Sequence, residues 1–456
     1  MKCAILLAAA SLVLCAQPAL AQDFTITNAT VAAGDGSEPV AGATVVVRNG
    51  RIASVGREID PVRSGEIIDG TGMWVTPGIF ASITTLGIVD VEAVSDSDDR
   101  GAGGSPFSAA LDVSPVINPA SQGIAVARTG GVTRASVMPI ASASIFGGQG
   151  AIVDLGADFN AVTRPRAFQV VEMGERGGRL AGGSRTSAHA LLRNALREAA
   201  RYGDDARLTG NTRTGPTRTG DDVPLDPRMT GRAERDSDVL LSRFDAAALV
   251  PVVNGQQKLY VKVERAIDIL SAIALREDFP KLDMVLVGAT EGWMVAERIA
   301  AAGVPVITVA LRDLPVSFEQ MAATQSNVGR MVDAGVTVAI GGYDSRGDLP
   351  HGLPQQAGNM VAISRVPGAT GLTWGEAFAT ITSVPARIAG LADTGVLEGG
   401  ARGDLVLWDG DPLELDSAPV KVWIDGVEQP LGNHRTRLRD RYRDLDESDL
   451  PKGYDR

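Results

Sequence analysis

The chain has 456 residues, enough for a large hydrophobic core and more than one domain. Hydrophobic residues make up 44% and charged residues 21% of the chain, in the range expected of a globular protein. The formal net charge of -12 argues against a nucleic-acid partner, because phosphate binding needs a concentrated excess of lysine and arginine.

The first 21 residues have the features of a secretory signal peptide. Lys2 supplies a positive charge, an apolar run follows from Ala4 to Ala16, and Ala19-Leu20-Ala21 is a small-x-small cleavage site before Gln22. The apolar run is shorter than the roughly 20 residues that a membrane-spanning helix needs. We therefore predict an exported protein, periplasmic in a Gram-negative host, with a signal peptide over 1–21 and no membrane span.

Residues 22–75 are predicted to form short β-strands. The runs Thr44–Val47 and Ile52–Val55 are rich in β-branched residues and flank Asn49-Gly50. This dipeptide between two such runs is a strong signal for a two-residue β-hairpin. After its leader, the chain is therefore expected to begin with a β-region.

The middle of the chain alternates short apolar runs with helical patterns, as parallel β/α units do. Strands are predicted over Val132–Met138, Leu259–Val263, Met284–Val287, Val304–Val309 and Val336–Ile340. Helices are predicted over Ala188–Arg201, Glu264–Ala274, Gly292–Ala302 and Ser317–Ala334. Repetition of this unit over about 300 residues favours a closed (β/α)8 barrel over an open sheet.

Two segments depart from the β/α pattern, and the end of the chain differs again. Ser95–Ser105 is acidic and rich in glycine, Leu208–Asp236 is rich in Gly, Thr, Arg and Asp, and both are predicted to be long surface loops. After Pro385 the β pattern returns, with a strand over Val420–Ile424. The highly charged segment Gly432–Arg456 is predicted to lie on the surface or to be partly disordered.

Six short motifs follow one another along the chain. They are Ile68-Asp69-Gly70-Thr71-Gly72, Val75-Thr76-Pro77-Gly78-Ile79, Gly130-Gly131-Val132-Thr133-Arg134, Gly147-Gly148-Gln149-Gly150, Thr290-Glu291-Gly292-Trp293 and Gly403-Asp404-Leu405-Val406-Leu407-Trp408-Asp409-Gly410-Asp411-Pro412. In this order they resemble the amidohydrolase superfamily, in its imidazolonepropionase-like and Xaa-Pro-dipeptidase-like branch. The resemblance covers nearly all of the chain after the leader.

The resemblance implies an α/β protein with a (β/α)8 TIM-like barrel and a small β-sandwich domain formed from both ends of the chain. We accordingly predict a composite β-sandwich over 22–76 and 388–430, and an amidohydrolase-like barrel over 77–387. A charged C-terminal tail is expected over 431–456.

The resemblance also implies a metal centre, and here the sequence departs from the family. Family members hold zinc or another divalent metal with a His-x-His pair at the end of the first barrel strand, where this chain has Ile83 and Thr85. The fifth-strand and sixth-strand histidines align with Lys262 and Gly288, and the eighth-strand aspartate aligns with Asp344. Isoleucine and glycine offer no donor atom, and a threonine hydroxyl is a poor zinc ligand. We predict no metal ligands and no cofactor.

The remaining strong donors do not replace the missing ligands. His189 lies in an Ala/Arg-rich predicted helix, His351 in a Pro/Gly loop and His434 in the charged tail. Both cysteines, Cys3 and Cys15, lie in the predicted signal peptide. A binuclear site needs about four imidazole or equivalent ligands, more than this inventory supplies.

Charged residues are the predicted occupants of the altered site. Lys262 and Glu264 are two apart on a predicted strand, so their side chains share one face. The resemblance makes that face the barrel mouth, where Asp344 also projects. We predict that Lys262 supplies the positive charge that metal gives the relatives and pairs with Glu264 and Asp344, because a buried ammonium without partners would be costly.

This cluster could be catalytic or structural. In the catalytic interpretation Asp344 is a general base and Lys262 an electrostatic stabiliser, with Glu264 as their partner. Tyr260, Glu291 and His351 are predicted to line the pocket and bind substrate. The alternative gives the charged residues a structural ion pair and the polar ones supporting or capping roles.

Two functions remain open. The first is an exported amidohydrolase-like protein that has lost, or strongly reduced, metal-dependent hydrolase activity and binds a small molecule or short peptide, or pairs with an active relative. The second is an active hydrolase of cyclic amides or small peptides, with an atypical or metal-poor site. Because family members often form dimers, the resemblance also makes a homo-oligomer an expected assembly.

Overall fold

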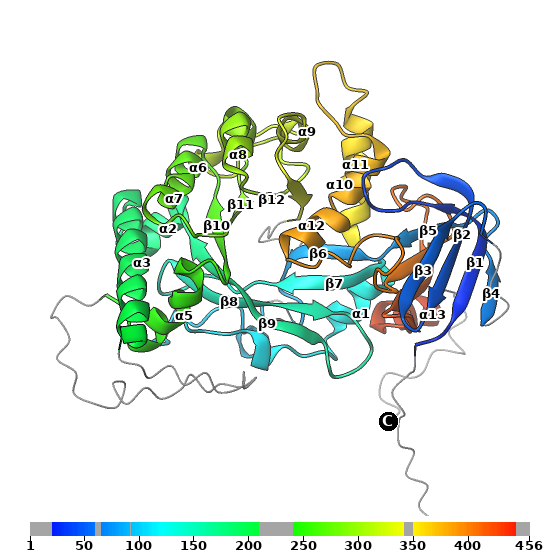
Figure 1. Ribbon diagram of the computed structural model, residues 1–456, viewed down its shortest axis with the longest axis horizontal. Helices are drawn as coiled ribbons and strands as arrows, with labels where there is room; N and C mark the ends of the chain where they lie inside the picture. The colour runs from blue at the N-terminus through cyan, green and yellow to red at the C-terminus, as the bar shows by residue number, and fades with distance from the viewer. Residues whose placement is uncertain (1–20, 60–64, 92, 209–239, 342–349, 444–456) are drawn as a thin grey trace, which may run out of the picture.

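The computed structural model describes residues 21–59, 65–91, 93–208, 240–341 and 350–443. Within these ranges, two eight-stranded sheets organise the chain (Figure 1). The predicted signal peptide up to residue 20, nearly all of the predicted loop over 208–236, and Asp344 lie outside the described residues.

The first sheet is built from both ends of the chain. Its strand order is β16-β15-β14-β5-β1-β2-β3, and β4 also pairs with β1. The strands are β1 (Phe24–Val31), β2 (Val40–Arg48), β3 (Arg51–Gly56), β4 (Glu66–Asp69), β5 (Trp74–Pro77), β14 (Leu405–Trp408), β15 (Pro419–Ile424) and β16 (Val427–Glu428). Antiparallel pairing of β5 with β14 joins the two ends, as the resemblance implies.

The predicted hairpin at the start of this sheet is confirmed. Strands β2 and β3 are antiparallel, with Arg48 opposite Arg51 and Asn49-Gly50 between them. Both turn residues have positive φ, 49° and 73°, as a two-residue turn that follows the strand twist requires.

The second sheet is a nearly closed barrel, as predicted. Its order is β13-β12-β11-β10-β9-β8-β7-β6. The strands are β6 (Ile79–Thr84), β7 (Val132–Val137), β8 (Phe146–Asp154), β9 (Val162–Glu172), β10 (Lys258–Val263), β11 (Met284–Gly288), β12 (Val306–Thr308) and β13 (Val338–Ile340). A short segment closes the ring: Ile340 N donates to Thr380 O at 3.0 Å, and Phe80 N donates to Ile381 O at 2.9 Å.

One strand departs from a regular parallel barrel. Strand β8 is antiparallel to both β7 and β9, whereas the other neighbours in the ring are parallel. The connections on either side of β8, residues 138–145 and 155–161, contain no helix. A parallel crossover needs a dozen or more residues, so connections this short return the chain antiparallel.

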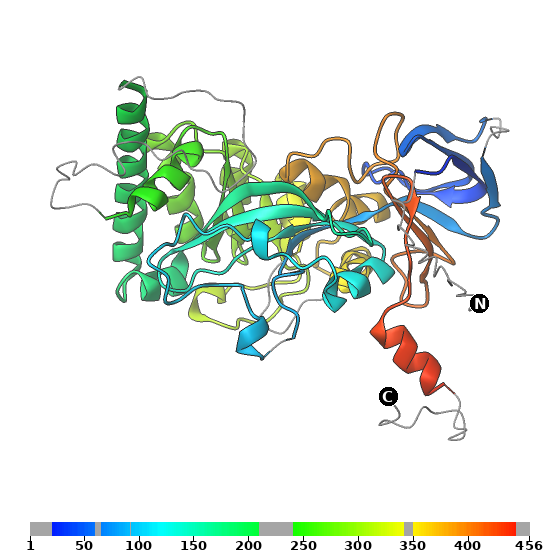
Figure 2. The same ribbon diagram turned by 90° about the horizontal axis from the view of Figure 1, so that it is seen from below.

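Helices surround the barrel, apart from the last one of those described, which stands away from it (Figures 1 and 2). They are α1 (Gln122–Thr129), α2 (Gly174–Leu180), α3 (Arg185–Leu208), α5 (Arg243–Val253), α6 (Ala266–Ile273), α7 (Leu275–Asp278), α8 (Ala296–Ala302), α9 (Asn327–Asp333), α10 (Leu353–Ile363), α11 (Trp374–Ala379), α12 (Ser383–Ile388) and α13 (His434–Arg441). None of the helices so described is long and apolar enough to cross a bilayer.

The helix predicted over Ser317–Ala334 is wrong in its first half. Only a 3-10 turn at Phe318–Gln320 and the helix α9 form there, separated by irregular chain. The side chain of Glu319 is drawn away to accept a hydrogen bond from the backbone N of Glu175 at 2.7 Å. This tertiary contact, which lies outside the local pattern, holds the segment in a non-helical path.

The predicted charged tail begins with a helix. Helix α13 has no buried residue, and Figure 2 shows it standing out from the rest of the chain. Asn433 caps it by accepting hydrogen bonds from the backbone N atoms of Arg435 and Thr436. The surface position of this part of the predicted tail is confirmed, and residues 444–456 lie outside the described ranges.

The barrel interior is filled with apolar side chains. This interior cluster consists of Ile83, Met138, Phe168, Val170, Tyr260, Val285, Val287, Ile307, Ala339 and Ile388. A larger apolar cluster lies between the strands and the surrounding helices. The barrel is therefore a packed core, and space for a ligand must be sought at its ends.

Candidate functional site

A pocket lies at the ends of the barrel strands. Its volume is about 720 Å³, within the range of about 300–1,000 Å³ that is usual for small-molecule sites. It is lined by Ser95, Asp98, Arg100, Gly101, Ile140, Ser142, Arg176, Lys262, Glu264, Arg312, Val316 and Gln320. These residues follow or end strands β6, β7, β9, β10 and β12, so the pocket occupies the carboxyl-terminal mouth of the barrel, where barrel enzymes place their sites. We call it the mouth pocket.

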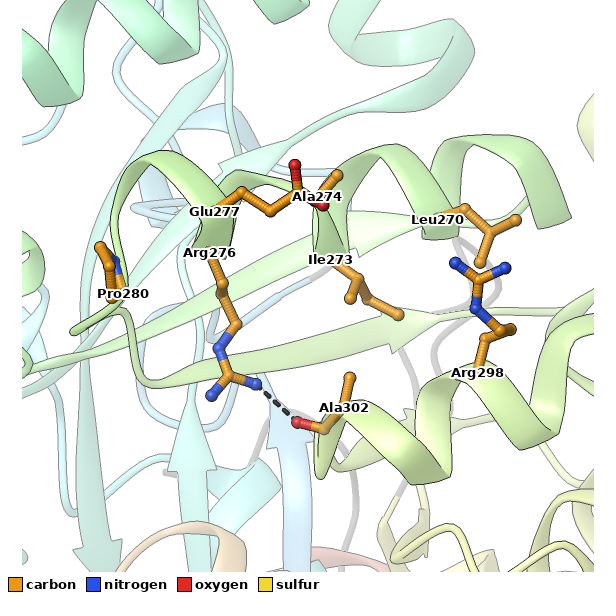
Figure 3. A pocket seen from close by; sticks show the side chains of 8 residues that line it. All are labelled: Leu270, Ile273, Ala274, Arg276, Glu277, Pro280, Arg298 and Ala302. Carbon is orange, nitrogen blue, oxygen red and sulfur yellow. Dashed lines mark hydrogen bonds between the residues drawn. The ribbon is translucent and has the colours of Figure 1, made fainter.

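A second, smaller hollow lies on the outer surface, among helices α6, α7 and α8 (Figure 3). Its volume is about 390 Å³, and Arg276 Nη1 donates to Ala302 O across it at 2.6 Å. None of the predicted site residues lines it. Because it lies on the outer helices, away from the strand ends, we place the functional site in the mouth pocket.

Lys262 in the mouth pocket is ion-paired, although with a different residue from the predicted one. Its Nζ lies 2.9 Å from Oε2 of Glu172, at the end of the neighbouring strand β9. Nε of Arg176 lies 3.5 Å from the same oxygen. Two cations therefore share one carboxylate, and the predicted pairing of Lys262 with Glu264 is corrected to this arrangement.

Glu264 has another role in the pocket wall. Its Oε2 accepts hydrogen bonds from Thr290 N at 3.0 Å and from Thr290 Oγ1 at 2.6 Å. Burial raises the pKa of Glu264 above its ordinary value, while the bonds from Thr290 and the charges of Lys262 and Arg312 oppose the rise. Lys262 thus acts on Glu264 through its charge.

The Glu264 carboxylate occupies the space beside Gly288, the position where the resemblance predicts the sixth-strand histidine of the family. A Cβ added at Gly288 would lie 2.7 Å from Cδ of Glu264 and closer still to its Oε1. Gly288 also has φ +95°, a backbone conformation that residues with a side chain rarely adopt. Position 288 therefore has no room for a metal-binding side chain in this arrangement.

The first-strand positions also lack strong ligands. Ile83 is 6% exposed and packs into the apolar interior cluster. Over the described part of the chain, no three His, Cys, Asp or Glu side chains lie together in a way that could hold a metal ion. The donor set among those residues does not fit the zinc or other divalent metal that the resemblance implies.

The other predicted substrate-binding residues lie elsewhere. Tyr260 is buried in the barrel interior, where its ring stacks on Phe168 with centroids 4.1 Å apart and burial raises the pKa of its hydroxyl. Glu291 accepts hydrogen bonds from the backbone N atoms of Ala266 and Ala322 and so ties the start of α6 to the segment after β12. Neither side chain lines the mouth pocket.

The histidines are also distant from this centre. His351 packs against Gly130, just before β7 begins, which places it at the barrel end opposite Lys262. Burial lowers the pKa of His351, and the charge of Arg435 acts in the same direction. His189 belongs to α3. His434, at the start of α13, contacts Gln122, at the start of α1. The structure gathers none of the three around the mouth pocket.

Sequence reasoning missed several charged residues of the mouth pocket and its wall: Glu172, Arg176, Arg100 and Arg312. For Glu172 a signal existed, because it directly follows the buried run Phe168–Val171 at a strand end. Arg176 follows four residues later, at the spacing of ion pairs on a helix. The two arginines on long connections carry no comparable local signal.

Comparisons with known proteins agree with the architecture. The model of the amidohydrolase family matches residues 287–428. The amidohydrolase tasK of Hapsidospora irregularis is 43% identical over 60 residues, which are 13% of this chain and only 6% of the length of that curated relative.

Solved structures extend the likeness to most of the chain. An amidohydrolase from Thermotoga maritima MSB8 has a TM-score of 0.73 and 24% identity, covering 89% of this chain and 99% of that one. A prolidase in complex with N-methylphosphonate-L-proline has a TM-score of 0.50 and 17% identity, with the same coverage. The family model thus matches the part of the chain from the last strands of the barrel to the last strands of the first sheet, and the solved structures share the barrel-plus-sheet fold with this chain.

Proposed function

We propose that this protein is an exported binding protein on an amidohydrolase barrel, whose metal-dependent hydrolase activity is lost or strongly reduced. The observation that carries the proposal is the Glu264 carboxylate, which fills the space beside Gly288 and is fixed there by Thr290. Hydrogen bonds close this wall, so position 288 has no space for a metal-binding side chain. The proposed ligand is a small molecule or short peptide in the mouth pocket.

The chemistry of the pocket supports this reading. Hydrolysis of an amide at neutral pH needs an activated water, which amidohydrolases obtain from metal. Lys262 contributes positive charge, but its Nζ donates a hydrogen bond to Oε2 of Glu172 at 2.9 Å. An ammonium in such a pair stabilises charge without generating hydroxide. The arrangement favours holding a ligand over cleaving it.

An active hydrolase with an atypical or metal-poor site is the second candidate. The raised pKa of Glu264 is the observation that favours it, because a carboxyl group titrating nearer neutrality is a better general acid or base. Asp344 remains the predicted general base of this alternative and Lys262 its electrostatic stabiliser. Cyclic amides and small peptides are the substrates to test.

Metal analysis separates the two proposals from an ordinary metal-dependent enzyme. The mature chain, residues 22–456, is incubated with zinc, dialysed and analysed by inductively coupled plasma mass spectrometry. We expect well under one zinc per chain. We also expect no chelator-sensitive hydrolysis of Xaa-Pro dipeptides or cyclic amides. Stoichiometric zinc, lost together with activity on chelation, would overturn the binding-protein proposal. Hydrolysis that resists the chelator and is lost in Glu264→Gln would favour the second candidate.

Export is proposed from the leader alone and needs its own experiment. The full-length chain is expressed in a Gram-negative host, the periplasmic fraction is isolated and the protein is sequenced from its amino terminus. We expect the sequence to start at Gln22. Recovery of the intact chain from the cytoplasm alone would refute this proposal.

A further inference from the structure

The wall of the mouth pocket holds an excess of positive charge. Oε2 of Glu172 serves both Lys262 and Arg176, and one carboxylate cannot neutralise two cations. Glu172 is 8% exposed at its side chain, whereas Lys262 and Arg176 are 21% and 44% exposed, so the cations and not the carboxylate face the opening.

Among the lining residues that the structure describes, the others do not cancel this excess. Arg100 and Asp98 bind each other, with Arg100 Nε 2.8 Å from Asp98 Oδ1, and so compensate one another. Glu264 is engaged by Thr290 in the wall, and burial opposes its ionisation. Because the whole chain carries a net charge of -12, a cationic pocket is not a consequence of overall composition. Such a pocket attracts an anion.

An apolar rim lies beside the same pocket. In the connection that follows β12, Leu314, Val316, Phe318 and Met321 are 74%, 69%, 83% and 63% exposed. Val316 also lines the mouth pocket, which makes the rim continuous with the cationic wall. Val91 and Val94, just before the lining residue Ser95, are exposed on the connection that follows β6. We call the four residues Leu314, Val316, Phe318 and Met321 the apolar rim.

The rim is held in place with its polar residues inside and its apolar residues outside. Between the exposed Phe318 and Met321, Glu319 and Gln320 are only 9% and 6% exposed. Oε2 of Glu319 accepts from Glu175 N at 2.7 Å and from Arg185 Nη2 at 3.3 Å. Folding alone would favour apolar side chains inside and polar side chains outside. Exposed apolar side chains that lie close together often mark an interaction site.

We propose that the mouth pocket binds an amphiphilic anion, with its carboxylate or phosphate head at Lys262 and Arg176 and its apolar group against the rim. The pocket has a volume of about 720 Å³, charged side chains within it and an apolar side chain at its edge. Such a concave site suits one amphiphilic molecule better than it suits the flat surface of a protein partner. This inference rests on the proposed function only in taking the mouth pocket as a ligand site.

Titration calorimetry with matched probes tests the ligand class. The mature chain is titrated with octanoate, octyl phosphate, octanamide, octylamine and propanoate. We expect octanoate or octyl phosphate to bind at least tenfold more tightly than the uncharged octanamide and than the short propanoate, and octylamine to bind most weakly. The ratio of octanoate to octyl phosphate affinity identifies which head group the pocket prefers. Equal binding of octanoate and octanamide, or no binding of either anion, would overturn the proposal.

Variants locate the binding in the mouth pocket. Lys262→Met and Arg176→Gln should each weaken the preferred anion at least fivefold, while Lys262→Arg retains most of the affinity. Phe318→Ser should weaken octanoate and leave propanoate unchanged. Lys258→Met, at the opposite end of β10, and Arg179→Gln, on the same helix as Arg176, are the matched controls and should stay within twofold. Equal losses in the controls would reveal general surface attraction and refute the assignment.

The outcomes distinguish this inference from the proposed function. If zinc is bound stoichiometrically and octanoate still binds with the expected charge preference, the binding-protein proposal fails and the ligand class stands. If no metal is bound and the probes show no preference for a negative charge, the ligand class fails and the loss of metal-dependent activity stands. Thermal melts of each variant by circular dichroism identify any that fail to fold, and Lys262→Arg then serves as the informative variant.

Discussion

Two ionic clusters in this protein use the same residue types in opposite ways. At the mouth pocket, Glu172 is shared by Lys262 and Arg176, whose side chains are partly exposed. Where the barrel meets the first sheet, Arg134 is shared by two acids: its Nε lies 2.6 Å from Asp404 and its Nη2 lies 2.7 Å from Asp425. We call the second set the junction cluster.

The difference between the clusters lies in burial and in how the charges are balanced. The side chains of Arg134 and Asp404 are each 1% exposed, so no ligand can reach this pair and its value is structural. The partly exposed Asp425 is balanced by a second cation, because Arg402 Nη1 lies 2.9 Å from its Oδ1. At the mouth pocket, by contrast, the cations Lys262 and Arg176 line a cavity. An ion pair is therefore a candidate for binding only where solvent can reach the charge in excess, and mutations should separate the two cases.

The largest effect is expected from Arg134→Met. Removing this guanidinium leaves the buried Asp404 without its cation, which should lower the free energy of unfolding by about 3–5 kcal/mol. Urea denaturation at neutral pH measures the change. Arg51→Met is the control, because the Arg51–Asp393 pair is exposed and should be worth less than about 1 kcal/mol. A loss below 1.5 kcal/mol for Arg134→Met, on the order of the exposed-pair value, would show that the two kinds of pair do not differ.

The junction cluster also explains why so much of the fold was predictable. Arg134 and Asp404 belong to two of the motifs that carry the family resemblance, as does Gly131, whose φ is +82° and where an added Cβ would lie 2.7 Å from the Trp408 ring. These motifs hold the barrel to the first sheet. Their roles are fixed by local sequence, so recognising them predicts the fold.

The mouth pocket was predictable only in part. Lys262 and Glu264 were found because strand periodicity places them on one face. Arg312 and Arg100 come from long connections, and nothing in the local pattern says which connections converge over the strand ends. Tyr260 follows the same strand rule as Lys262, yet it lies deeper and packs on Phe168 inside the barrel. Periodicity gives the face of a strand and leaves the depth along it undetermined.

Gly288→Ala tests the closed wall of the mouth pocket. The new Cβ meets the Glu264 carboxylate and sits at φ +95°, so we expect a loss of about 2–3 kcal/mol in unfolding free energy. Gly303→Ala is the matched control: φ there is +62° and nothing lies within 4 Å of an added Cβ, so only the backbone cost of about 1 kcal/mol applies. Similar losses at both positions would mean that the carboxylate yields easily.

The double variant Gly288→Ala/Glu264→Ala isolates the carboxylate. Removing Glu264 deletes the atoms that the new Cβ would meet, so the loss caused by Gly288→Ala should be smaller in the Glu264→Ala background. The coupling between the two substitutions is expected to be about 1 kcal/mol. Strict additivity would show that backbone strain alone disfavours a side chain at position 288.

Asp154 sharpens the contrast by its pH dependence. It lies opposite Arg134 in the β7–β8 pairing, and burial raises its pKa to about 6, with the charge of Arg134 opposing the rise. For an acid whose pKa is higher in the folded state, the contribution to stability is full below the unfolded value of 3.8 and is lost as pH rises through 6. Asp154→Asn should therefore be about 1–2 kcal/mol more stable than wild type at pH 7.5 and no more stable at pH 4.

The measurement for Asp154 is a pair of urea denaturation series at the two pH values. Asp416→Asn, at an exposed position, controls for the loss of one negative charge. A stabilisation by Asp154→Asn that is equal at both pH values would indicate a gain in packing or hydrogen bonding, and the proposed titration of Asp154 beside the junction cluster would be wrong.

The smallest effect on stability is expected from Lys262→Met. In contrast to Arg134→Met, this substitution leaves no buried charge without a partner. Glu172 keeps Arg176 at 3.5 Å when the ammonium is removed, and Lys262 is partly exposed, so the unfolding free energy should change by less than about 1 kcal/mol. Urea denaturation of Lys262→Met beside Lys258→Met measures this change on one strand. A loss comparable to that of Arg134→Met would show that the ion pairs of Lys262, Arg176 and Glu172 stabilise the fold. A cation whose role is to bind a ligand should contribute little to the unfolding free energy of the protein without that ligand.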